Sequence, residues 1–144
     1  MRSPCDLLNI LLVEDKEGDA RLAVEAFSES RIRNRVYHVR DGVEAMAFLR
    51  KQGEHADAPS PHLILLDLNM PRKDGREVLS EIKHDEALKM IPVIVLSISD
   101  GECEIDKTNK LRADSFFTKP IKFDQFLEVV RSIESFWLGN DKIT

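Results

Sequence analysis

The stretch that decides the fold of this chain is LILLDLNMPRKDG, residues 63–75. Four aliphatic residues lead directly to a carboxylate, Asp67, and Pro71 and Gly75 then mark a loop. A short run that is apolar on both faces is typical of a buried parallel strand. We therefore predict a strand over residues 63–67 that presents Asp67 at the rim of a sheet, and we predict that the chemistry takes place on Asp67.

The same pattern of an apolar run followed by polar residues recurs on both sides of this stretch. Strands that are apolar on both faces and alternate with helices indicate a parallel sheet covered by helices on its two sides, an α/β fold. Residues 52–61 contain glycine, prolines and serine and predict a loop. The other predicted strands are 9–13, 35–39 (an edge strand), 92–96 and 115–118, and the predicted helices are 20–27, one capped by Asp41, 77–83, 102–111 and 123–138.

The composition is that of one globular domain of 144 residues, and we expect its core at about residues 8–138. The net charge of −5 disfavours binding to nucleic acid. No apolar run is long enough to span a bilayer, so we expect no membrane association. Cys5 and Cys103 form no disulfide framework and predict free thiols, which places the protein in the cytoplasm.

Polar side chains follow four of the predicted strands: Glu14 and Asp15, Asp67, Ser97, and Lys119. In a doubly wound sheet, ligands bind beyond the carboxyl ends of the strands. Three carboxylates gathered there repel one another and attract a hard divalent cation, for which Mg²⁺ is the best match. Asp67 is then a nucleophile toward phosphorus, and the ammonium and the hydroxyl stabilise the phosphoryl group.

On these residues, in this order, the chain resembles the receiver domain of two-component response regulators over nearly its whole length. The resemblance implies a flavodoxin-like, doubly wound, five-stranded parallel sheet with strand order 2-1-3-4-5. It also implies that a sensor histidine kinase phosphorylates Asp67. Mg²⁺ would be held by Asp15, Asp67 and the main-chain carbonyl of Asn69, with Glu14 acting mostly through water.

The resemblance further implies a switch in which Ser97 is coupled to Phe116, so that the face made by residues 102–111, 115–118 and 123–138 changes shape. Three positions depart from the family pattern. Glu14 stands where Asp is usual, Ser97 where Thr is commoner, and Phe116 lacks a phenolic hydroxyl. On this interpretation the protein is a signalling protein that catalyses only its own uptake and loss of phosphate.

Two other classes of function were weighed against the phosphoryl-accepting switch. A phosphatase of the haloacid-dehalogenase type also forms an aspartyl phosphate, but it needs a second acid two residues after the nucleophile. That position is Asn69, whose amide cannot shuttle a proton. The other class is a binding module that works without phosphorylation, and the complete set of acids, hydroxyl and lysine argues against it.

The predicted last helix, 123–138, carries more apolar side chains than one buried stripe can absorb: Phe123, Val129 and Phe136 lie outside the stripe that includes Trp137. Either the helix has a broad core face, or it carries an exposed patch used for self-association. We favour the exposed patch, because the end of the helix would otherwise overhang a small domain.

The Phe-Trp-Leu ending and the long loop before residues 63–67 are similar to the response regulators that partner bacterial phytochromes. This narrower resemblance implies a phytochrome as the sensor kinase. It also implies a homodimer through residues 102–111, 115–118 and 123–138, with Phe123, Phe136 and Trp137 in the interface.

The histidines are interpreted as surface residues, because none of them belongs to a metal-ligand motif, and we expect no zinc site. They are His38, His55, His62 and His84.

Overall fold

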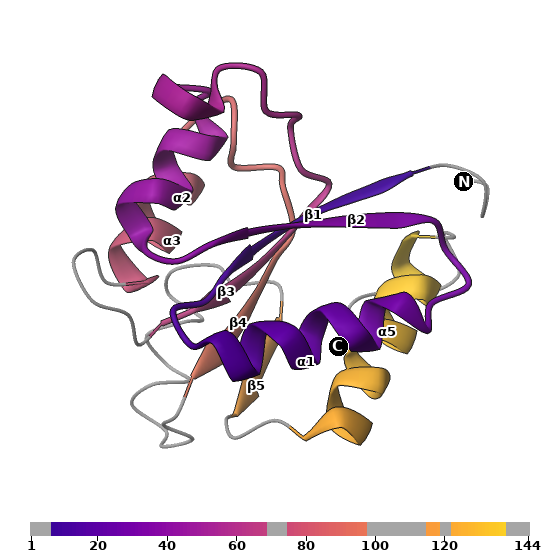
Figure 1. Ribbon diagram of the computed structural model, residues 1–144. Coiled ribbons are helices and arrows are strands. Elements are labelled where there is room, and N and C mark those ends of the chain that lie inside the picture. The colour runs from indigo at the N-terminus through magenta and orange to yellow at the C-terminus, as the bar shows by residue number, and fades with distance from the viewer. Residues whose placement is uncertain (1–6, 69–74, 98–114, 119–121, 138–144) are drawn as a thin grey trace.

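The structure is a computed structural model that describes residues 7–68, 75–97, 115–118 and 122–137, without the side chains of 97, 115–118 and 136. It contains strands and helices in alternation, as predicted (Figure 1). The strands are β1 (Leu8–Val13), β2 (Asn34–Val39), β3 (Leu63–Asp67), β4 (Val93–Ser97) and β5 (Ser115–Thr118). The helices are α1 (Glu17–Ser28), α2 (Gly42–Leu49), the 3₁₀ turn η1 (Gly53–His55), α3 (Gly75–Lys83) and α5 (Phe123–Trp137).

All five strands pair in parallel in one sheet, in the order β2-β1-β3-β4-β5. The predicted strand order is confirmed. The chain first moves from β1 to β2 on one side and then to β3 on the other side of β1. This reversal of direction occurs at β1 and β3, beyond whose carboxyl ends doubly wound sheets bind their ligands.

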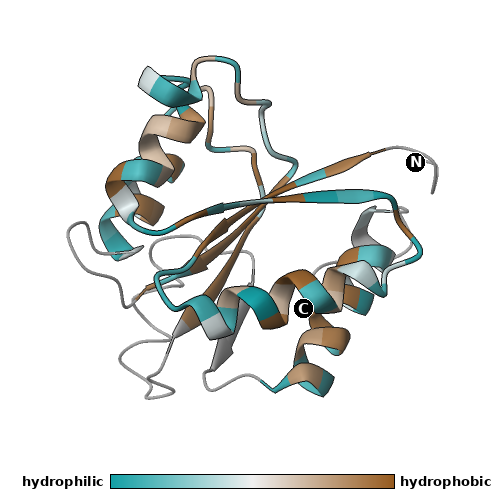
Figure 2. Cartoon of the chain, in the orientation of Figure 1, coloured by the Kyte–Doolittle hydropathy of each residue, from teal (hydrophilic) through white to brown (hydrophobic). Residues whose placement is uncertain are grey.

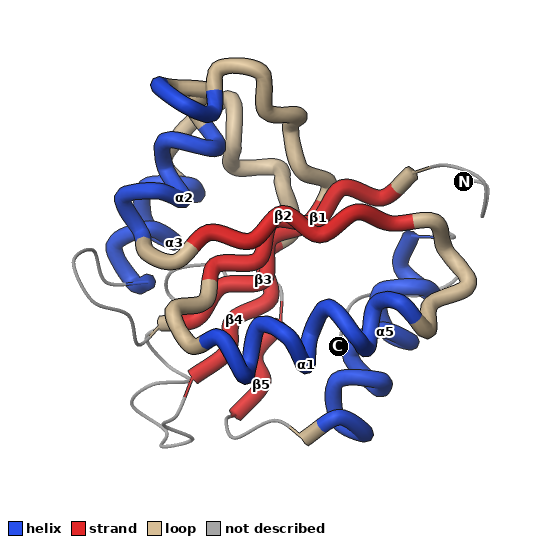
Figure 3. Tube along the Cα trace, viewed as in Figure 1, coloured by secondary structure: helices blue, strands red, loops and turns tan. Residues whose placement is uncertain are grey.

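Helices cover both faces of the sheet, which gives three layers (Figure 3). Alternate residues of β3 enter different cores: Leu65 packs on the side of α1 and α5, and Leu66 packs on the side of α2 and α3. This explains why the strand is apolar at every position, and Figure 2 shows the central strands as mostly hydrophobic. Among the helices described, none is long and apolar enough to cross a membrane.

Two helices begin earlier than their apolar pattern predicts. Helix α1 begins at Glu17. Its first turn is polar and faces solvent, so hydrophobic spacing does not reveal that turn. Helix α3 begins at Gly75, whose N–H donates to the carbonyl of Leu68 at 3.2 Å. A Cβ atom at Gly75 would lie 2.4 Å from the carbonyl oxygen of Asp67, so only glycine fits there. The predicted helix over 102–111 lies outside the described residues.

Helix α5 corrects the prediction of an exposed apolar patch. Val129 is fully buried, and Trp137 is 5% exposed. The ring of Trp137 packs edge-on against His62, just before β3, with ring centroids 4.8 Å apart. Because α5 packs on α1 as well as on the sheet, two sides of the helix are covered. Val129 and Trp137 therefore belong to a broad core face, and Trp137 offers no exposed surface for a dimer interface.

The histidines also correct a prediction. His84 is exposed, whereas His38, His55 and His62 are half-buried. His55 packs against Phe48 with ring centroids 5.4 Å apart, and Nδ1 of His62 accepts a hydrogen bond from the main-chain N–H of Asn9 at 3.0 Å. Histidine rings with such contacts serve packing and hydrogen bonding within the fold, and an isolated position in the sequence does not reveal this.

Candidate functional site

The ends of β1 and β3 bring the predicted acids together. Strand register pairs Val13 with Leu66, so the residues that follow them, Glu14 and Asp67, leave the sheet side by side. One carboxylate oxygen from each of Glu14, Asp15 and Asp67 lies within 4.8 Å of the others. Glu14 and Asp67 are each 1% exposed, and Asp15 is half-buried. The three acids singled out in the sequence therefore form one site.

The chemistry of this group suits a divalent cation. Three carboxylates at such short range repel one another in a poorly hydrated environment. The Oδ1 atom of Asp15 is buried and has no hydrogen-bond partner among the described residues. A buried acceptor of this kind needs a partner, and hard cations such as Mg²⁺ and Mn²⁺ take oxygen ligands. The residues present therefore fit a bound metal ion.

Main-chain hydrogen bonds hold the acids at the strand ends. The N–H of Glu14 donates to the carbonyl of Val39 at 3.0 Å, and the Glu14 side chain accepts from the N–H of Lys16 at 3.3 Å. On the other side, Leu68 donates its N–H to the carbonyl of Leu96 at 2.9 Å, which continues the β3–β4 pairing past Asp67. The acids thus extend from a rigid sheet edge.

One residue beside the site was missed in the sequence. Nε2 of His38, on β2, lies 2.6 Å from the main-chain oxygen of Glu14. The two residues are 24 positions apart, so no local pattern links them. The register of β1 with β2, which pairs Leu12 with His38, could have shown that the imidazole lies near this strand end.

The remaining predicted site residues are placed only in part. Strand β4 ends at Ser97, one residue later than predicted, and Phe116 pairs with Val95, but neither of these two side chains is described. Asn69 and Lys119 lie outside the described residues. Their roles remain predictions.

Comparison with known proteins assigns the family. Residues 10–131 match the family described as the response regulator receiver domain. The chain belongs to this family. The response regulator Rcp1 of Synechocystis sp. is 48% identical over 129 residues, which cover 90% of this chain and 88% of Rcp1. This receiver domain is therefore a signalling protein of the two-component class.

Solved structures agree with the sequence comparison. The Mn²⁺-bound form of Rcp1 matches this receiver domain with a TM-score of 0.83 and 45% identity, over 95% of this chain and 99% of that one. The phosphorylated cyanobacterial phytochrome response regulator RcpA matches with a TM-score of 0.85 and 48% identity, over 96% of this chain and 99% of that one. One relative thus holds a divalent metal, and another carries a phosphoryl group.

Proposed function

We propose that this receiver domain accepts a phosphoryl group on Asp67 from a phosphohistidine of a sensor kinase. The observation that carries the proposal is the group of three carboxylates at the ends of β1 and β3. Asp67 is the last residue of β3, on a rigid strand, so its carboxylate is held in place before phosphate arrives. Positioning and charge neutralisation supply most of the catalysis in phosphoryl transfer.

The transfer needs little covalent work from the protein. A carboxylate oxygen of Asp67 forms a bond to phosphorus while the bond between phosphorus and the histidine nitrogen breaks, and the freed imidazole takes up a proton. Asp15, Asp67 and the main-chain carbonyl of Asn69 would hold Mg²⁺, and Glu14 would act mostly through water. When bound, the cation offsets negative charge on the phosphoryl oxygens.

The same proposal gives roles to residues beyond the carboxylates. Lys119 adds a positive charge near the phosphoryl group, and the hydroxyl of Ser97 donates a hydrogen bond to it. Movement of Ser97 toward the phosphoryl oxygen opens space into which Phe116 turns. The backbone register supports this coupling, because β4 and β5, which carry the two residues, are paired neighbours. A change of charge at Asp67 would then alter the shape of the face made by residues 102–111, 115–118 and 123–138.

We propose a phytochrome-type sensor kinase as the phosphoryl donor. The support is the similarity to Rcp1 and to the phytochrome response regulator RcpA, each 48% identical to this chain. Transfer from a phosphorylated phytochrome kinase should be faster than transfer from an unrelated histidine kinase at equal concentration. Equal rates from both kinases would count against this partner.

The acceptor is tested with acetyl phosphate and Mg²⁺, using a gel that retards phosphorylated protein. The wild type should gain one phosphoryl group, and Asp67→Asn should gain none. Asp57→Asn, a change of the same kind at an exposed loop position, is the matched control and should be labelled like the wild type. Labelling of Asp67→Asn at the wild-type rate would refute the assignment.

We also propose that two copies associate through the face that contains α5. Phe123, at the start of α5, is only half-buried and so reaches the surface, which supports a contact there. Phe136 is the second residue proposed for this interface. Light scattering should give a dimer for the wild type and a smaller mass for Phe123→Ser. A monomer for both proteins would remove this part of the proposal.

A further inference from the structure

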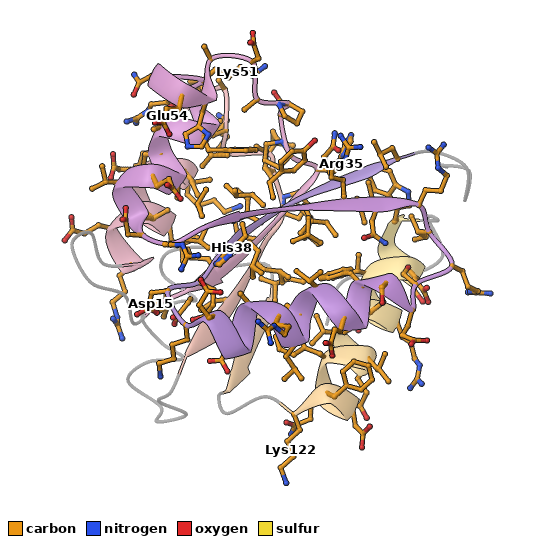
Figure 4. All side chains as sticks on the ribbon, in the orientation of Figure 1. Asp15, Arg35, His38, Lys51, Glu54 and Lys122 are labelled. Carbon is orange, nitrogen blue, oxygen red and sulfur yellow. The ribbon has the colours of Figure 1, made fainter. Side chains whose placement is uncertain are left out.

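His38 lies at the end of β2 and contacts the main chain of the acid cluster. Its Nε2 atom is 2.6 Å from the carbonyl oxygen of Glu14. A carbonyl oxygen can only accept a hydrogen bond, so Nε2 carries the hydrogen and donates it. Figure 4 shows His38, on β2, and Asp15, which follows β1, at the same end of the sheet. The imidazole is thus linked to the peptide that joins the first two acids.

The contact lies where the main-chain pairing between β1 and β2 stops. The N–H of Glu14 still donates to the carbonyl of Val39 at 3.0 Å. The N–H of Arg40, the residue after Val39, donates at 3.1 Å to Oε1 of Glu44 in α2. Strand β2 ends at Val39 and Asp41 caps α2, so the chain leaves the sheet here, and the side chain of His38 supplies a donor to the carbonyl of Glu14.

We propose that His38 is a positioning residue for the cation site. Its hydrogen bond holds the carbonyl of Glu14 and so fixes the plane of the Glu14–Asp15 peptide bond, because a peptide unit is rigid. The direction in which the Asp15 side chain leaves the backbone follows from that plane. His38 itself touches neither the cation nor the phosphoryl group. This inference rests on the proposed function, since it concerns the metal ion that would assist phosphoryl transfer to Asp67.

The geometry separates this role from general packing. Glu14 is 1% exposed, so its carbonyl lies where water is scarce and a lost donor is not easily replaced. Asp15 follows immediately, and its buried Oδ1 has no hydrogen-bond partner in the part of the chain that the structure describes. A small rotation of the shared peptide would move that oxygen relative to the carboxylate of Asp67. Metal affinity should therefore be more sensitive to His38 than overall stability is.

The test measures Mg²⁺ affinity by isothermal titration calorimetry on four variants. His38→Leu removes the donor and should weaken binding about three- to tenfold, the effect of one net hydrogen bond. His38→Gln places an amide N–H at similar reach and should bind within about twofold of the wild type. His38→Asn keeps an amide that is too short to reach the carbonyl of Glu14, and it gives a second variant without this hydrogen bond should His38→Leu not fold. His84→Leu, at an exposed position, is the control and should bind like the wild type.

Phosphoryl uptake from acetyl phosphate gives a second measurement. The variants without this hydrogen bond should be slow at limiting Mg²⁺ and approach the wild-type rate at saturating Mg²⁺, whereas a purely structural role would not produce this dependence. Unchanged Mg²⁺ affinity in those variants, or binding by His38→Gln as weak as theirs, would overturn the inference. If the wild type takes up no phosphate, the proposed function fails, but the affinity series still decides the role of His38.

Discussion

Two of the places where the described residues bury carboxylates differ in what surrounds the charge. Glu134, on α5, is 8% exposed and accepts hydrogen bonds from the hydroxyl of Ser30 at 2.9 Å and from the N–H of Arg31 at 2.8 Å. The guanidinium of Arg31 lies 4.0 Å away. At the ends of β1 and β3, three carboxylates instead lie within 4.8 Å of one another.

This difference separates a structural carboxylate from a functional one. Glu134 receives its donors from the segment that follows α1, so its charge is compensated by the chain itself and ties α5 to that segment. The clustered acids add like charges to one another, which favours the binding of a cation from solvent. Burial alone does not distinguish the two cases, whereas the sign of the neighbouring groups does.

The largest expected effect is at Glu134. Glu134→Ala should lower the free energy of unfolding by about 3 kcal/mol, because two donors lose a charged acceptor in a site with little water. Urea unfolding in EDTA measures the change. Glu134→Gln retains one acceptor oxygen and should cost about half as much. A loss below about 1 kcal/mol for the alanine variant would show that water replaces the carboxylate and that the hydrogen bonds to Glu134 contribute little to stability.

Adding Mg²⁺ should have the next largest effect, and only at the acid cluster. A ligand at about 100 times its Kd stabilises the native state by about 2.7 kcal/mol. The melting temperature of the wild type should therefore rise with Mg²⁺. Glu134→Gln should show the same rise from a lower starting value, since its site takes no cation. Equal stabilisation of Asp15→Asn would place the metal elsewhere.

Neutralising one clustered acid should stabilise the metal-free protein. Asp15→Asn removes one of three repelling charges and should raise the free energy of unfolding in EDTA by about 1–2 kcal/mol. This sign is opposite to that expected for Glu134→Gln, although both variants lose one negative charge. Asp57→Asn, exposed in a loop, should change stability by less than about 0.5 kcal/mol. A destabilised Asp15→Asn would contradict the expected repulsion among the three acids.

The smallest expected effect is at the donor of the structural pair. Ser30→Ala removes the hydroxyl that donates to Glu134 and accepts from the N–H of Ile32 at 3.1 Å. We expect a loss of about 1 kcal/mol by urea unfolding, because the N–H of Arg31 still serves the carboxylate. In a Glu134→Ala background, Ser30→Ala should lower the free energy of unfolding by less. Equal losses in the two backgrounds would mean that Ser30 and Glu134 are not coupled.

Local pattern predicted most of the sheet. Strands β3 and β5 have the predicted bounds, β1 and β2 begin one residue earlier than predicted, and β4 begins and ends one residue later. The agreement is close because an apolar run ends where burial on both faces ends. The three acids were also predicted, since Glu14 and Asp15 come directly after one apolar run and Asp67 after another. What made the site visible in the sequence was the repetition of one local signal at several strand ends.

The features that were missed all depend on contacts between distant segments. The bond from His38 to Glu14 spans 24 positions, and the bond from Ser30 to Glu134 spans 104. Trp137 was predicted in a dimer interface because the end of its helix was expected to overhang a small domain. The packing of α5 on α1 covers a second side of that helix, and a single helix pattern contains no information about such a neighbour.

Trp137 is the single tryptophan of the chain, and its ring lies in the core against His62. The intrinsic fluorescence of the protein therefore arises from one known position, where α5 meets the residue before β3. Its emission should shift to longer wavelength when that contact opens to water. Unfolding and any displacement of α5 can thus be followed optically in the unlabelled wild type and in each variant above, with no dye attached near the acids.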